Sequence, residues 1–176
     1  MRGNYGKILR IALFAKVIAL DDIDRQILSA LTENGRKPYR EIARTLGVSE
    51  GVVRQRVAKM AEEKLMRITA IGNLNKMGFD AVAMVLIKVK PGHVEECAAK
   101  LAEYQSIRFV AILFGGADIV IQTLHTTLDE LHEFVRNQLP KDLPEIISFE
   151  TYPEVRTIKS SWNWSSWFDL QQGKTR

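Results

Sequence analysis

The spacing of apolar residues changes at about residue 80. Before it, apolar positions recur at helical intervals, first as a stripe of Ile23, Ile27, Leu28 and Leu31. Asp21 precedes this stripe as a capping residue and Asn34-Gly35 follows it as a stop signal. The pattern therefore predicts a helix between Asp21 and Asn34.

Two more short helices are expected directly after it. Lys37-Pro38 opens the second, Gly47 ends it, and Ser49 caps the third. The inward positions of these two helices are Ile42, Ala43, Leu46, Val53, Val57 and Met60. Three short helices with a tight Gly-Val turn between the last two describe a helix-turn-helix. The weak alternation from Leu65 to Phe79 predicts a small β ribbon, or wing, and a linker.

The second half alternates strand and helix patterns. Ala81 to Val89 is apolar on both faces, which predicts a strand. A helix from His93 to Tyr104 follows, then strands at 107–114 and 118–124 that are joined by Gly115-Gly116. A helix from Thr127 to Leu139 is expected to end at Pro140 and Pro144, before a final strand or bent pair over 146–158. This β-α-β-β-α-β order predicts a ferredoxin-like sandwich, and hence an α+β protein.

The patterns divide the chain into five parts. They are a basic extension (1–19), the helix-turn-helix (20–67), the wing and linker (68–80), the ferredoxin-like domain (81–158) and a Trp-rich tail (159–176). We interpret 1–19 as an amphipathic extension rather than a signal peptide, because no small-residue cleavage site follows it. For Trp162, Trp164 and Trp167 we favour burial against the chain's own or a neighbouring subunit over stacking on nucleic acid.

Charge separates the two halves further. The net charge is +4 and the pI about 9.2. Bases outnumber acids over 1–79 and acids outnumber bases over 80–155. Nucleic acid is therefore attracted to the first half and repelled by the second. The single cysteine, Cys97, excludes a disulfide framework and fits a cytoplasmic protein, and no apolar run is long enough to span a membrane.

Catalytic and metal chemistry has no support in the sequence. His93, His125 and His132 do not cluster with Cys97 or with paired acids at metal-ligand spacing, and surface or capping roles suit them better. Nucleophile-elbow, phosphate-loop and zinc-protease motifs are absent from the sequence. We therefore expect no enzyme activity, no catalytic or metal site and no cofactor.

In order and spacing, several motifs resemble the Lrp/AsnC family, also called feast/famine regulators. In the first half they are Leu20 to Asp24, Asn34 to Arg36, Tyr39 to Ala43, and Leu46 to Gly51. Gly115 to Asp118 stands where that family has a Gly-x-x-Asp turn. Val52 and Ala117 depart from it, at positions where the family often has Thr and an aromatic residue. The resemblance implies a winged helix-turn-helix followed by a ligand-sensing domain, acting as a sequence-specific transcription regulator.

The resemblance also implies partners. They are double-stranded DNA, an amino-acid effector and a second copy of the chain, with octamers built as rings of four dimers. Strands that are apolar on both faces favour the dimer independently, because a two-layer sandwich covers only one of those faces. Two alternatives remain open: an architectural DNA-binding protein without an effector, and a small ferredoxin-like enzyme with an accessory domain.

Candidate DNA contacts fall on the second and third helices. Arg and Gln side chains can reach base edges in the major groove, while Lys and a helix N-terminus hold phosphates. On and before the third helix the candidates are Ser49, Glu50, Gly51, Arg54, Gln55, Arg56 and Lys59. Backbone contacts are expected from Arg36, Lys37, Tyr39 and Arg40.

Candidate effector contacts are Gly115, Gly116 and Asp118. Backbone amides at the glycines can bind a carboxylate and Asp118 an ammonium, which matches an amino-acid zwitterion. The alternative is a plain hairpin turn in which the aspartate caps its own loop.

Overall fold

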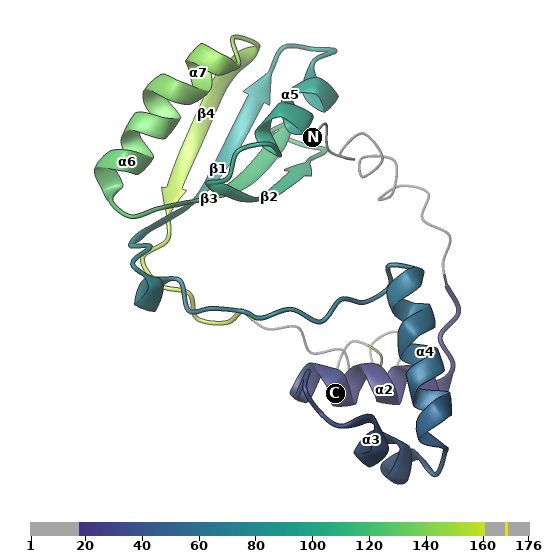
Figure 1. The fold of residues 1–176 in the computed structure, drawn as a ribbon. Coiled ribbons are helices and arrows are strands. Elements are labelled where there is room, and N and C mark those ends of the chain that lie inside the picture. The colour runs from purple at the N-terminus through teal and green to yellow at the C-terminus, as the bar shows by residue number, and fades with distance from the viewer. Residues whose placement is uncertain (1–17, 161–167, 169–176) are drawn as a thin grey trace. The chain divides into compact units, whose positions relative to one another are not determined.

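The computed structural model describes residues 18–160 and residue 168 (Figure 1). Within that part of the chain, residues 18–71, 159–160 and 168 belong to one compact unit and residues 72–158 to another. The extension before residue 18 and the three tryptophans lie outside the described residues, so their predicted roles stay predictions.

The first unit is helical, with α2 (Asp22–Glu33), α3 (Tyr39–Leu46) and α4 (Glu50–Glu62). The capping signals act as expected: Asp21 and Asp24 form a reciprocal capping box on α2, and the Ser49 hydroxyl accepts the Val52 N–H at 3.3 Å. Gly47 has φ 67°, the left-handed conformation that a tight turn between α3 and α4 requires. The predicted apolar stripes form the core, with Ile27, Leu28, Leu31, Ile42, Ala43, Val53, Val57 and Met60 buried.

The predicted wing is not formed. Between α4 and residue 80 the described chain has no strand, only the short 3-10 helix η2 (Asn75–Met77). Ile68 and Ile71 are exposed there, at 49% and 82%. Weak alternation alone does not make a strand, because the backbone N–H and C=O groups of a strand need a neighbouring strand to pair with.

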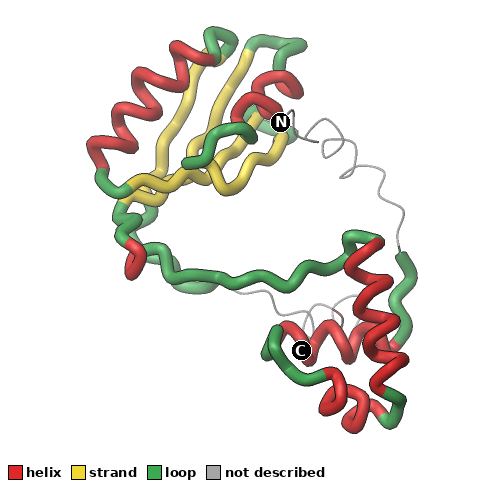
Figure 2. The backbone as a smooth tube through the Cα atoms, in the orientation of Figure 1, coloured by secondary structure: helices red, strands yellow, loops and turns green. Residues whose placement is uncertain are grey.

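The second unit confirms the β-α-β-β-α-β order. It contains β1 (Ala81–Val89), α5 (Val94–Leu101), β2 (Ile107–Ile112), β3 (Ile119–His125), α6 (Leu128–Glu133), η3 (Phe134–Gln138), α7 (Leu139–Asp142) and β4 (Ile146–Pro153). The four strands form one antiparallel sheet in the order β2-β3-β1-β4, labelled in Figure 1 and drawn in yellow in Figure 2.

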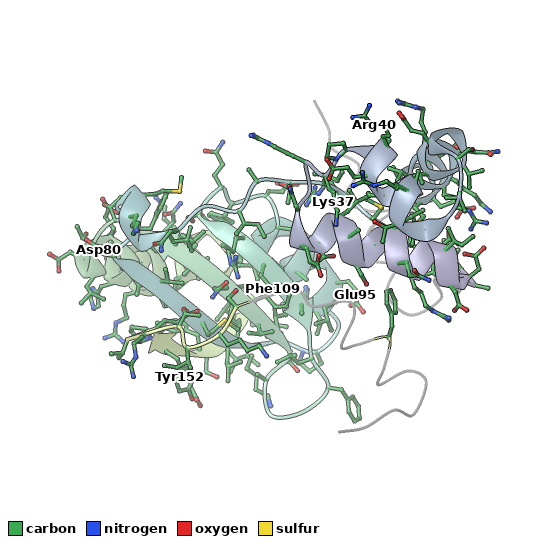
Figure 3. All side chains as sticks on the ribbon, turned by 90° about the horizontal axis from the view of Figure 1, so that it is seen from below. Lys37, Arg40, Asp80, Glu95, Phe109 and Tyr152 are labelled. Atoms are coloured by element: carbon green, nitrogen blue, oxygen red, sulfur yellow. The ribbon has the colours of Figure 1, made fainter. Side chains whose placement is uncertain are left out.

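The helices of this unit pack on one face of the sheet. That face carries Ala83, Val85 and Ile87 of β1, which join a buried core with residues of α5, α6, η3 and α7. The opposite face, here called the open face, carries the alternate positions. The register aligns Phe109, Gln122, Met84 and Tyr152 in one row across it, and Figure 3 labels Phe109 and Tyr152 on the two edge strands.

Pro140 does not end the second helix of this unit. The helical run continues through it to Asp142, because the turn before it widens into the π-helix η3. There the Leu139 N–H donates to the Phe134 carbonyl five residues earlier, which removes the usual clash of a proline ring with the preceding turn. The final strand is β4 alone and stops at Pro153, short of the predicted residue 158.

Candidate nucleic-acid interface and effector pocket

The outward face of α4 is polar and basic. Val53, Val57 and Met60 are buried in the core of the helical unit, while Arg54, Gln55 and Lys59 are exposed. Glu50 and Gly51 are exposed at the N-terminus of the same helix, where Ser49 is engaged as its cap. A helix of this kind, preceded by α3 and a tight turn, can enter a major groove with its N-terminal residues toward the bases.

Arg54 is held over α3. Its guanidinium donates to the Glu50 carboxylate at 2.8 Å and its Cζ lies 5.6 Å from the centre of the Tyr39 ring. The side chain is nevertheless 67% exposed. Because an exposed ion pair contributes little stability, Arg54 can exchange Glu50 for a base edge or a phosphate at small cost.

Arg56 has a different environment. Its Nη1 lies 2.5 Å from Asp21 Oδ2 and 2.9 Å from Asp24 Oδ1, and the side chain is only 29% exposed. Hydrogen bonds from the Asp24 N–H and then from Arg56 lower the pKa of Asp21, and the two carboxylates raise the pKa of Arg56. Arg56 therefore joins α4 to the first turn of α2, a structural role that differs from the DNA contact expected of it from the sequence.

The predicted backbone contacts gather at the start of α3. Arg36 and Arg40 are exposed and Lys37 is half-buried, and Figure 3 shows Lys37 and Arg40 on the helical unit. Tyr39 is also half-buried, because its ring packs against the core as well as under Arg54. The turn itself is ordered by Asn34, whose side-chain oxygen accepts the Arg36 N–H at 2.9 Å.

A hollow of about 480 Å³ lies in the second unit beside the β2–β3 hairpin. Gly115 and Gly116, the predicted effector contacts, line it together with side chains from β1 and β4. The lining is completed by Leu86, Lys88, Leu113, Phe114, Ala117, Ser148, Phe149 and Glu150. The Lys88 Nζ donates to the Gly116 carbonyl at 3.2 Å.

Asp118 does not line this hollow. Its carboxylate accepts the Val89 N–H at 2.9 Å, and its own N–H donates to the Ile87 carbonyl at 3.0 Å. The Val89 bond lies where the β1–β4 register shifts between Lys88 and Val89. Asp118 thus satisfies an amide of the neighbouring strand, which differs from both the predicted ammonium contact and the alternative of capping its own loop.

The charged residues that line the hollow are Lys88 and Glu150, whereas the sequence predicted a carboxylate from Asp118 and backbone amides from the glycines. Both are exposed, on the two sequence-distant strands β1 and β4, and both line the hollow. The only signal in the sequence was Lys88, a charged residue in an otherwise apolar strand. A Cβ added to Gly115 or Gly116 would meet no atom within 4 Å, so packing within this unit does not require glycine there.

His132 is exposed and His93 precedes α5 at its N-cap position, so among the three histidines His125 differs from the surface or capping role expected. His125 is half-buried, with its ring 5.0 Å from that of Phe134, and burial lowers its pKa. Within the described residues, no group of three or more His, Cys, Asp or Glu side chains could hold a metal ion. No described helix is long and apolar enough to cross a membrane.

Comparison with known proteins matches both units. Residues 20–61 match the AsnC-type helix-turn-helix domain and residues 82–163 the Lrp/AsnC ligand binding domain. An uncharacterised HTH-type transcriptional regulator of Pyrococcus furiosus is 39% identical over 150 residues, 85% of this chain and 99% of the relative. The chain belongs to the Lrp/AsnC family.

Several solved structures share the fold. E. coli AsnC is 26% identical, with a TM-score of 0.76 over 84% of this chain and 99% of its own. A regulator of Neisseria meningitidis, solved as a complex with L-Met, is 19% identical, with a TM-score of 0.73 over 82% and 96%. This Lrp/AsnC protein is a DNA-binding transcriptional regulator with a ligand-binding domain, and not an enzyme.

Proposed function

We propose that this Lrp/AsnC regulator recognises specific DNA sequences through α4 and that an amino acid modulates this binding. The observation that carries the proposal is the exposed row of Arg54, Gln55 and Lys59 opposite a fully apolar buried face. Arg54 and Gln55 read base edges. Lys59, Arg36, Lys37, Tyr39 and Arg40 hold the phosphate backbone.

The two kinds of contact differ in their effect on binding. Arg54→Ala or Gln55→Ala costs about 1–3 kcal/mol on the preferred site and relaxes its specificity. Lys59→Ala weakens binding to all sequences alike. It also reduces the slope of the logarithm of the binding constant against the logarithm of the salt concentration by about one unit. Titration of each variant against the preferred site and a scrambled duplex, at several salt concentrations, separates the two. If both Arg54→Ala and Gln55→Ala kept the parent's preference for the specific site over the scrambled duplex, these two residues would not read bases.

The effector proposal centres on the hollow beside Gly115 and Gly116. An amino-acid zwitterion needs a positive partner for its carboxylate and a negative partner for its ammonium. Lys88 and Glu150, which have opposite charges, line the same hollow. The Lys88 ammonium binds the effector carboxylate and the Glu150 carboxylate binds its ammonium. Ala117 leaves more room than an aromatic residue would, which favours an effector with a larger side chain. The L-Met complex of the Neisseria fold relative makes an amino acid a reasonable ligand class.

Calorimetry against the twenty amino acids tests this. We expect one or a few to bind, and Glu150→Gln and Lys88→Met each to weaken binding tenfold or more, since hydrogen bonds to charged groups are worth roughly 1.5–3 kcal/mol. Asp118→Ala is a less specific test, because it also removes the partner of the Val89 amide. If no amino acid binds at millimolar concentration, the effector-free architectural protein becomes the better interpretation.

A further inference from the structure

Phe168 is a described residue far beyond β4, and it packs against the core of the helical unit. Its ring lies 6.0 Å from the Cζ of Arg25 in α2. Phe168 also lies beyond residue 163, where the match to the family's ligand binding domain ends. The contact therefore joins Arg25, inside the matched helix-turn-helix domain, to a residue outside both matched domains.

The environment of the Arg25 guanidinium favours contact with an aromatic ring. One edge of its guanidinium is satisfied, since Nη1 lies 3.0 Å from Asp22 Oδ1. Its Nε is buried and makes no hydrogen bond with any described residue, and the side chain is only 27% exposed. A ring lying over a guanidinium offers a cation–π contact in place of the missing acceptor and covers the aliphatic stem at the same time.

One added aromatic residue contributes a large share of the apolar burial, and hence of the stability, of the helical unit. Its core among the described residues consists of eight buried side chains from three short helices. Small cores bury a low fraction of their apolar surface, so each further apolar contact is a large share of the total.

We propose that the surface of α2 around Arg25 is a docking site for the chain's own C-terminal segment, with Phe168 as its anchor. The chain leaves the helical unit at residue 71, builds the sheet unit and returns to the helical unit after residue 158. Stability of the DNA-binding helices thus depends on residues at the opposite end of the chain.

Hydrogen exchange of the α2 amides in the full chain tests the docking. We expect Phe168→Ala to speed exchange in α2 on the order of tenfold, because it removes both apolar burial and the cation–π contact. Phe168→Tyr keeps the ring and should keep the protection. Val155→Ala is the control, since Val155 is fully exposed in the connection after β4. Parent-like exchange in Phe168→Ala would overturn the proposal.

A second measurement identifies the occupant. A chain ending at Ser160 should lose the same α2 protection, and a peptide of residues 161–176 added in trans should restore it, while the same peptide with Phe168→Ala should not. Mixing the shortened chain with intact chain should leave two α2 populations, one protected and one not. If intact chain instead protects the shortened one, a second copy supplies the ring and the own-chain assignment is wrong.

Discussion

At the scale of single residues, Arg54 and Arg56 of α4 have different environments. Arg56 is held by Asp21 and Asp24, whereas Arg54 is exposed beside Glu50. We predict that Arg56→Met lowers the stability of the helical unit by about 1 kcal/mol, a value reduced by solvent screening because the guanidinium is partly exposed. DNA affinity should then fall only in proportion to the folded fraction.

Thermal unfolding combined with DNA titration below the transition checks this prediction. Arg54→Ala should show the reverse behaviour, with parent-like unfolding and weakened DNA binding. Arg44→Ala, an exposed position at the end of α3, serves as a control for loss of positive charge. If Arg56→Met kept the parent's melting temperature but lost DNA affinity, Arg56 would be a DNA contact and not a structural residue.

At the scale of elements, Tyr104 connects three helical segments of the sheet unit. It follows α5, its hydroxyl donates to Asp142 of α7 at 2.7 Å, and its ring meets Phe134 of η3 edge-on at 5.5 Å. Burial, and then the Asp142 hydrogen bond, raise the pKa of Tyr104 to about 12 from 10.0. The neutral phenol is thus favoured in the folded state, so this contribution is complete below pH 10 and is lost as pH rises through about 12.

We therefore predict that one tyrosine ionises near pH 12 and that Tyr104→Phe removes this step. Tyr104→Phe should cost about 1 kcal/mol at neutral pH, the net value of one hydrogen bond, and should flatten the fall of stability between pH 10 and 12. Absorbance titration and chemical denaturation at several pH values measure both effects. Equal slopes for the parent and Tyr104→Phe over that interval would contradict the assignment.

At the scale of the whole molecule, the open face of the sheet is the surface most suited to a second copy. Val82, Met84 and Leu86 are only half-buried on it, while the unit's helices pack on the other face. Beside them, Gln122 of the inner strand β3 accepts a hydrogen bond from Arg108 and donates one to Glu154. Subunit interfaces combine apolar side chains of this kind with hydrogen-bonded polar groups.

We predict that the protein is at least a dimer through this face and that Met84→Lys makes it monomeric at micromolar concentration. A buried charge at the centre of an interface has no partner, and removing it from water costs several kcal/mol. Leu128→Lys is the matched control, because Leu128 is 62% exposed at the start of α6, away from the open face. Sedimentation equilibrium gives the mass. A monomeric parent protein would reject this interface and, with it, the two-fold half-site spacing expected of the DNA.

The sequence by itself determined the features that depend on near neighbours. Helical periodicity and capping residues act within four positions, so Asp21, Gly47 and Ser49 mark the helices of the first unit where the structure has them. Strand alternation is equally local, which is why the β-α-β-β-α-β order could be predicted. Recognition of the family rested on the same local motifs, read in their order along the chain.

Only the tertiary structure decided which distant groups meet. Arg56 finds carboxylates more than thirty positions away, and Asp118 accepts an amide from β1 rather than facing the hollow. Lys88 and Glu150 come together because the register places β4 beside β1. The wing failed as a prediction for the same reason, since alternation cannot show whether a second strand is present. A side chain's partner is chosen by competition among all groups within reach, and that set is known only once the chain has folded.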